Sequence, residues 1–168
     1  MPQTLSAPQP VASPRPVSGL ATKTHCAIVA RRPANPVAAQ VLDLSLIETG
    51  EFVIVPLDPA RIEALCTRLK LDDRPFSDMA PDCALTLRLA DELGLDRFAL
   101  IQTDETGWQG AQAATVYHGR VRTMAVRKGA GALNDALERI GVRPDGGRDA
   151  VDTLGLGFVG NAGLFPGR

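Results

Sequence analysis

Two acids, a tryptophan and an amide side chain lie in one short glycine-flanked segment, and their types suit recognition chemistry. Asp104 and Glu105 supply negative charge, and Trp108 is the only tryptophan in the sequence. Gln109 both donates and accepts hydrogen bonds. The segment follows the apolar run 98–103, which predicts a loop at the end of a strand, where binding residues are often found. We expect Trp108 to anchor a binding surface there, unless it packs beneath the sheet and leaves both acids solvated.

His118 is the residue that would turn this loop into an acid–base site, as a general base working with Asp104 or Glu105. Neither a nucleophile nor a group that orients the imidazole is evident in the sequence. The pair His118-Gly119 also separates two β-prone runs, which is typical of a hairpin turn where His tolerates a positive φ. The sequence therefore favours a non-enzymatic protein. A small enzyme or small-molecule binder that uses Asp104, Glu105 and His118 is the alternative.

Arg120 and Arg122 alternate along the second strand of that hairpin, so both side chains are expected on one face, beside Thr115 and Tyr117. Two arginines on one face can contact an acidic partner. The competing interpretation is that they form the solvated face of an amphipathic sheet, which is the commoner arrangement. We include both arginines among the expected binding residues.

The three cysteines, Cys26, Cys66 and Cys83, are far apart and include no C-x-x-C pair. Their number and spacing argue against a disulfide framework and a zinc site, and favour free thiols in a reducing cytoplasm. His25 and Cys26 are neighbours on a predicted strand, so they point to opposite faces, which disfavours a catalytic pair. Cys83 lies at a predicted helix start, where the dipole lowers a thiol pKa, although a small buried side chain is the commoner role.

Two further patterns suggest ligand sites but lack the required context. One is an acidic stretch of four aspartates, Asp72, Asp73, Asp78 and Asp82. Its spacing is not that of a calcium loop, so we expect a solvated loop without a metal. The other is G-x-G-x-x-G at 155–160, but residues 161–168 are too few and too rich in glycine and proline to form the helix that a dinucleotide requires. We expect no cofactor, and we expect Phe158 and Phe165 to pack back onto the domain or to contact a partner.

Composition limits the classes of partner. The 168 residues carry a net charge of −1, and 45% of them are hydrophobic. This balance argues against a nucleic-acid partner, which usually meets a basic surface. No apolar run approaches the roughly 18 residues of a membrane helix. Residues 1–22 contain five prolines and no acid, which predicts a disordered tail in preference to a transit peptide.

Apolar periodicity divides the rest of the chain into strands and helices. Strands are predicted at 25–30, 52–57, 98–103, 111–117 and 120–126. Helices are predicted at 58–69, 82–93 and 130–140, with a shorter one between 37 and 46. These elements indicate a single α+β domain over 24–154, with a mixed or mostly antiparallel sheet of about five strands and about three helices mainly on one face. Residues 155–168 form a glycine-rich C-terminal segment.

The stretch from Phe98 to Gly157 resembles a pattern in a group of small bacterial proteins that have no established activity. The shared features are a strand, an acidic glycine-bearing turn, a hairpin turning at a glycine, and a helix. The motifs that carry the likeness are Gly110-Ala111-Gln112-Ala113-Ala114, the helix 133–142, and Asp152-x-Leu154-Gly155-Leu156-Gly157. The resemblance implies no particular chemistry. The turn departs from the pattern, since Thr106-Gly107-Trp108 stands where an aromatic residue and paired glycines are expected.

The residue types and the charge balance together predict a cytoplasmic, non-enzymatic module that binds another protein, as an accessory, adaptor or immunity-type protein. Its expected contact regions are the Trp-bearing loop and the terminal segments. A homo-oligomer, with the tails as tethers, is a third alternative. Neither a membrane nor a nucleic acid is expected as a partner.

Overall fold

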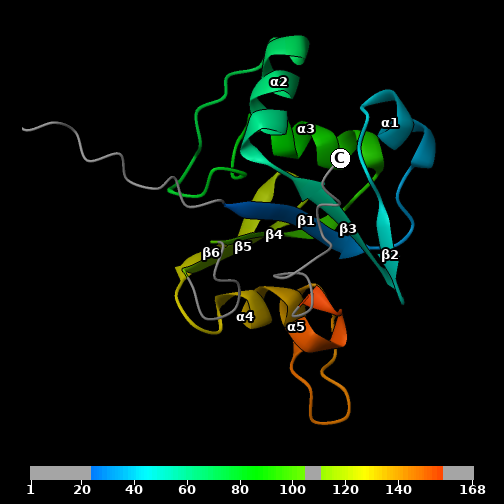
Figure 1. Ribbon diagram of the computed structural model, residues 1–168, viewed down its shortest axis with the longest axis vertical. Helices are drawn as coiled ribbons and strands as arrows, with labels where there is room; N and C mark the ends of the chain where they lie inside the picture. The colour runs from blue at the N-terminus through cyan, green and yellow to red at the C-terminus, as the bar shows by residue number, and fades with distance from the viewer. Residues whose placement is uncertain (1–23, 105–110, 157–168) are drawn as a thin grey trace, which may run out of the picture.

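One antiparallel sheet organises the chain, with six strands in the order β2-β3-β1-β4-β5-β6. The computed structural model in Figure 1 describes residues 24–104 and 111–156. The strands are β1 (His25–Arg31), β2 (Ile47–Thr49), β3 (Phe52–Leu57), β4 (Arg97–Thr103), β5 (Gln112–His118) and β6 (Val121–Lys128). The helices are α1 (Pro36–Val41), α2 (Pro59–Leu69), α3 (Ala84–Leu93), α4 (Ala132–Arg139) and α5 (Ala150–Thr153). The α+β class is confirmed, and β2 and α5 are the elements that the sequence did not predict.

Helices cover both faces of the sheet. Figure 1 shows α1, α2 and α3 on one side and α4 and α5 on the other. The sequence indicated helices mainly on one face, so the second layer is a correction. Its cause lies in the central strands, whose side chains alternate between two cores. Ile28 belongs to the core beneath α1–α3 and Val29 to the core beneath α4–α5, and a sheet that is apolar on both faces must bury both.

Local signals explain where α2 begins, but not where α3 begins. The Asp58 carboxylate accepts a hydrogen bond from the N–H of Arg61 at 2.7 Å. Pro59 occupies the first turn, so α2 begins where the sequence predicts. The start of α3 differs from the prediction, because the helix begins at Ala84 and not at Asp82. Asp82 has a buried role, described below.

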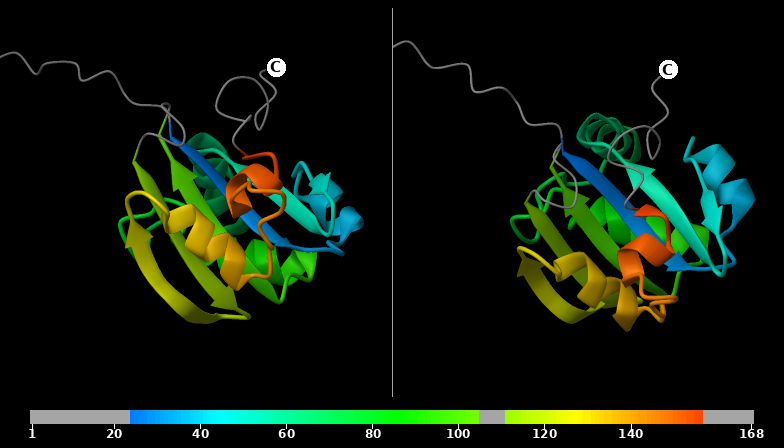
Figure 2. Two further views of the ribbon diagram at one scale, coloured as in Figure 1. Left: turned by 90° about the horizontal axis from the view of Figure 1, so that it is seen from below. Right: turned by 60° about the horizontal axis from the view of Figure 1, so that its bottom comes forward.

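The second helical layer is fixed through α4. Leu133 and Leu137 are fully buried against the sheet. The side chain of Asn134 accepts a hydrogen bond from the N–H of Val151 and donates one to Asp149, the N-cap of α5, each at 3.0 Å. These two bonds hold α5 beside α4. Figure 2 shows the two helices on the same face of the sheet. In the described part of the chain, neither these helices nor the others have the length and apolar character of a membrane span.

The two edge strands of the sheet differ in length. β2 has three residues and pairs with Phe52–Ile54 of β3. Pro56 lies beyond that pairing, near a strand end, as the sequence indicates. β6 has eight residues and shifts its register twice against β5. The long edge is therefore β6, which Figure 2 shows in yellow at the outside of the sheet.

Candidate functional site

Asp104 closes the base of the predicted binding loop. Its Oδ2 accepts a hydrogen bond from the N–H of Ala111 at 2.9 Å. Just below, Thr103 of β4 pairs with Gln112 of β5, so the loop joins two neighbouring antiparallel strands. The other three residues expected to bind there lie outside the described residues, and their binding role stays a prediction: Glu105, Trp108 and Gln109.

The structure does not bring His118 to Asp104. His118 pairs with Arg97 at one end of the β4–β5 ladder, and Asp104 follows the other end. Six residues of strand, at about 3.4 Å each, separate the two ends by roughly 20 Å. His118 instead places its Nε2 3.0 Å from Oδ2 of Asp96, in an exposed pair. An acid–base site built from His118 and Asp104 is therefore not assembled.

Arg122 lies in a buried polar cluster with Asp82 and Tyr117. The Asp82 side chain is 1% exposed and accepts hydrogen bonds from Nη2 of Arg122 at 2.5 Å and from the Tyr117 hydroxyl at 2.7 Å. Arg122 also donates to the Tyr117 oxygen, at 3.2 Å from Nε and 3.0 Å from Nη2. Burial, together with the hydrogen bond to Asp82, raises the pKa of Tyr117 to about 12. The sequence predicted that Asp82 would be solvated. This prediction is wrong, because the Tyr117 hydroxyl and the Arg122 guanidinium take the place of water around its carboxylate.

Arg120 also points toward α3, where it pairs with Asp91. The two hairpin arginines thus share a face, as predicted. Each of them is held by an aspartate of the segment that packs against the hairpin. Their first role is to fasten the hairpin to α3 and to the residues before it, and contact with a partner stays a prediction.

The remaining candidates do not form reactive sites among the described residues. Cys26, Cys66 and Cys83 are free and buried. Burial raises the pKa of the Cys26 thiol to about 12 and also raises that of Cys66, so neither thiolate is favoured near neutral pH. Asp78 pairs with Lys128, which lowers the pKa of that carboxyl. Within residues 24–104 and 111–156, no three acidic, histidine or cysteine side chains are grouped as metal ligands.

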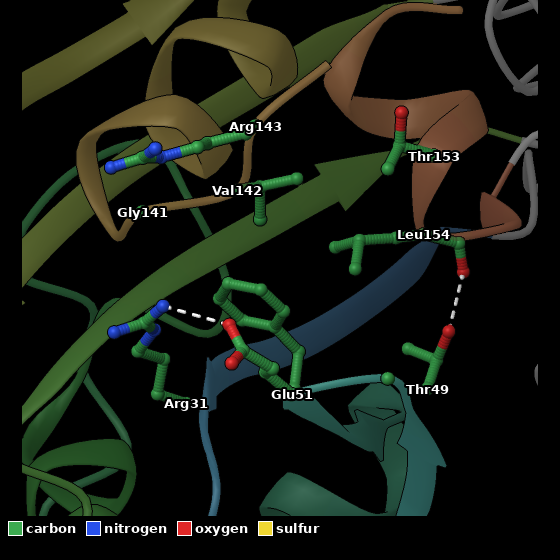
Figure 3. Close-up of a pocket in the computed structure, with 10 residues that line it drawn as sticks. Arg31, Thr49, Glu51, Gly141, Val142, Arg143, Thr153 and Leu154 are labelled. Atoms are coloured by element: carbon green, nitrogen blue, oxygen red, sulfur yellow. Dashed lines mark hydrogen bonds and ion pairs between the residues drawn. The ribbon is translucent and has the colours of Figure 1, made fainter. Parts of the chain in front are cut away.

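A cavity of about 490 Å³ opens between the sheet and the second helical layer. Its walls come from the end of β1, the turn between β2 and β3, the segment after α4, and α5 (Figure 3). Ten residues line it: Arg31, Thr49, Gly50, Glu51, Phe52, Gly141, Val142, Arg143, Thr153 and Leu154. Thr49 donates a hydrogen bond to the carbonyl of Leu154 at 3.4 Å and so links the two layers beside the cavity.

Charge is concentrated at one side of this cavity. Nη2 of Arg31 lies 2.8 Å from Oε2 of Glu51, and its guanidinium lies over the ring of Phe52, 5.7 Å from the centroid. Arg143 forms no ion pair with another described residue. In Figure 3 the guanidinium groups of Arg31 and Arg143 lie on the same side of the cavity, with Gly141 between them. Sequence reasoning missed this site, because its residues come from separate segments that carry no shared motif.

The chain matches no protein-family model, and neither a curated protein nor a solved structure matches it significantly. The loop, the β6 edge and the cavity must therefore be interpreted from their own chemistry.

Proposed function

We propose that this protein is a non-enzymatic cytoplasmic module that binds another protein. The observation that carries the proposal is the outer edge of β6. Among the described residues β6, eight residues long, pairs with β5 alone, and the backbone N–H and C=O groups that point away from β5 form its outer edge. An extended segment of a partner can add to such an edge through main-chain hydrogen bonds, while side chains give specificity.

The position of the Asp104 loop supports a surface shared with this edge. Ala113, two residues after the loop closes at Ala111, pairs with Lys128 at the end of β6. The base of the loop is therefore one strand away from the end of the β6 edge. A partner segment laid along β6 would pass near this base, and Trp108 of the same loop is the proposed anchor.

The charges of β6 favour a selective partner. Arg122, Arg127 and Lys128 each pair with an aspartate of a neighbouring element. The register of β6 against β5 is also irregular. Charged side chains and bulges protect exposed edges from indiscriminate pairing with other sheets. The β6 edge therefore suits a partner segment that matches its charges and register better than it suits an arbitrary exposed strand.

The chemistry of the other candidates supports binding in preference to catalysis. His118 and Asp104 are at opposite ends of a strand pair, and the thiols are buried. Three free cysteines also fit a reducing compartment, where disulfides are rare.

Affinity capture from the native host tests the proposal with three baits: the unchanged protein, Ala125→Pro in β6, and Glu48→Pro in β2. Proline removes a backbone donor and distorts an edge strand. The β2 variant is the matched control, since it places the same change in the opposite edge. We expect one stoichiometric partner with the unchanged and Glu48→Pro baits, and a loss of about tenfold or more with Ala125→Pro, because a few main-chain hydrogen bonds are lost. Circular dichroism and Tm must show that all three baits are folded.

Equal capture by all three baits would exclude the β6 edge as the contact. Trp108→Ala, and chains shortened by residues 1–22 or 155–168, would then test the loop and the terminal segments, which include Phe158 and Phe165. If none of these changes reduces capture, the β6 edge, the loop and the terminal segments are all excluded as the contact, and capture of no stoichiometric partner by the unchanged bait would overturn the protein-binding proposal. Light scattering covers the homomeric alternative: a dimer that Ala125→Pro converts to a monomer would identify the partner as a second copy of this chain.

A further inference from the structure

We propose that the cavity beside Arg31 and Arg143 binds a small organic anion, a molecule with one carboxylate or phosphate group and an apolar body. The cavity lies at the end of β1 and at the β2–β3 turn. These strands form the half of the sheet that is farther from β6. The inference therefore goes beyond the proposed protein-binding function and does not depend on it.

Two arginines supply the charge that an anion requires. Arg143 forms no ion pair or hydrogen bond with another described residue. Arg31 gives Nη2 to Glu51, but a guanidinium has five N–H donors, so those on Nε and Nη1 are left for a ligand. With one glutamate against two arginines, the lining carries a net positive charge. Arginine is well suited to carboxylate and phosphate, because its planar group can donate two parallel hydrogen bonds.

Gly141 keeps Arg31 open to the cavity. Its φ of 101° lies in a region that other residues rarely adopt. A Cβ at this position would be 3.7 Å from Nε of Arg31 and 3.9 Å from its Cζ, so any side chain would cover that edge of the guanidinium. The N–H groups of Gly141 and Val142 also bond to the last carbonyls of α4, each at 3.0 Å, which reduces the negative charge at that helix end.

Apolar residues in the rest of the lining suit an apolar body. Phe52, Val142 and Leu154 line the cavity from both layers. The hydroxyl of Thr153 adds one polar group to the lining, and it is already bonded within the α5 turn at 2.7 Å. The volume of about 490 Å³ falls within the roughly 300–1,000 Å³ of small-molecule sites. A small molecule with one anionic end fits this distribution of charge and apolar surface.

Nuclear magnetic resonance titration of the full-length protein tests the site, with benzoate and inorganic phosphate as probes and benzamide as the neutral counterpart of benzoate. Amide signals of residues 49–52 and 141–143 should shift and saturate with an anion but not with benzamide. Saturation with benzoate alone assigns the site to carboxylates. Saturation with phosphate alone assigns it to phosphates, and saturation with both supports the shared anion chemistry.

Arg143→Gln should weaken the saturating anion by about tenfold or more, as expected when a charge-assisted hydrogen bond is lost. Arg148→Gln is the matched control, because it removes the same charge from an exposed residue outside the cavity lining. The spectrum of each variant shows whether it is folded. Shifts that spread over the surface without saturating, or equal losses in both variants, would overturn the proposal.

Discussion

Two arginines of the sheet have the same two kinds of neighbour, an acid and an aromatic ring, but their acids differ sharply in exposure. Arg122 pairs with Asp82 and lies over the ring of Tyr117, 5.5 Å from its centroid. Arg31 pairs with Glu51 and lies over Phe52 in the same manner. The acid beside Arg122 is 1% exposed, whereas the acid beside Arg31 is 76% exposed.

Burial separates the roles of these two clusters. In the Arg122 cluster both carboxylate oxygens of Asp82 and the hydroxyl of Tyr117 are bonded inside the protein, so losing the acid or the guanidinium leaves a buried group without its partner. In the Arg31 cluster water can replace any partner, so the pair contributes little to stability. An arginine, an acid and an aromatic ring therefore hold the fold together in the buried cluster at β6, and the same combination at the end of β1 remains available to a ligand.

Removal of the Asp82 carboxylate should have the largest effect. Asp82→Ala leaves the Arg122 charge and the Tyr117 hydroxyl without their acceptor. We expect the free energy of unfolding to fall by about 3 kcal/mol, at the lower end for broken buried pairs because the Arg122 side chain is 33% exposed. Denaturant unfolding measures this change.

Asp91→Ala is the matched control for that measurement, because Asp91 pairs with Arg120 on the same face at the surface. Its loss should cost less than about 1 kcal/mol. Equal destabilisation by the two variants would mean that burial does not distinguish these ion pairs, and the contrast between the clusters would break down.

The titration of Tyr117 reports on the buried cluster without a mutation, because it is the only tyrosine in the chain. The ultraviolet absorbance of tyrosinate should rise with a midpoint near 12 in the folded protein, compared with 10.0 for an unperturbed tyrosine. The folded state holds this proton more tightly than the unfolded state, so its contribution to the free energy of unfolding falls as pH rises through this interval. Asp82→Asn should lower the midpoint only in part, since burial is the larger cause. A folded midpoint at the ordinary value would contradict the buried contact.

Regular apolar patterns made much of the fold predictable. The strands β1, β3 and β4 each contain an uninterrupted run of mostly apolar residues, and Asp58-Pro59 marks the start of α2. β2 and α5 have three and four residues, too few to show a period. The second helical layer was missed because an apolar run does not show that its alternate residues supply two separate cores.

The sites were less predictable, since they depend on contacts between distant segments. Asp82 has the local pattern of a helix start, and its burial depends on Tyr117 and Arg122, which follow much later in the chain. Arg31 and Arg143 line one cavity only because α4 and α5 fold across the sheet. Two glycines of the lining, Gly50 and Gly141, have a positive φ, but a glycine in a turn or after a helix usually indicates only the turn or a cap.

Glu51→Gln should give the smallest change in stability and separate the two clusters most clearly. Both side chains of the Arg31–Glu51 pair are exposed, so the free energy of unfolding should change by less than about 1 kcal/mol. The same variant removes the one acid of the cavity lining and releases Nη2 of Arg31. Binding of benzoate or phosphate should then tighten roughly twofold to fivefold, the range expected for one exposed charge.

Glu48→Gln is the control, because Glu48 pairs with Arg32 outside the cavity lining and the net charge changes equally. Equal tightening in both variants would reduce the effect to overall charge, whereas a loss of stability like that of Asp82→Ala would show that the exposed cluster is also structural.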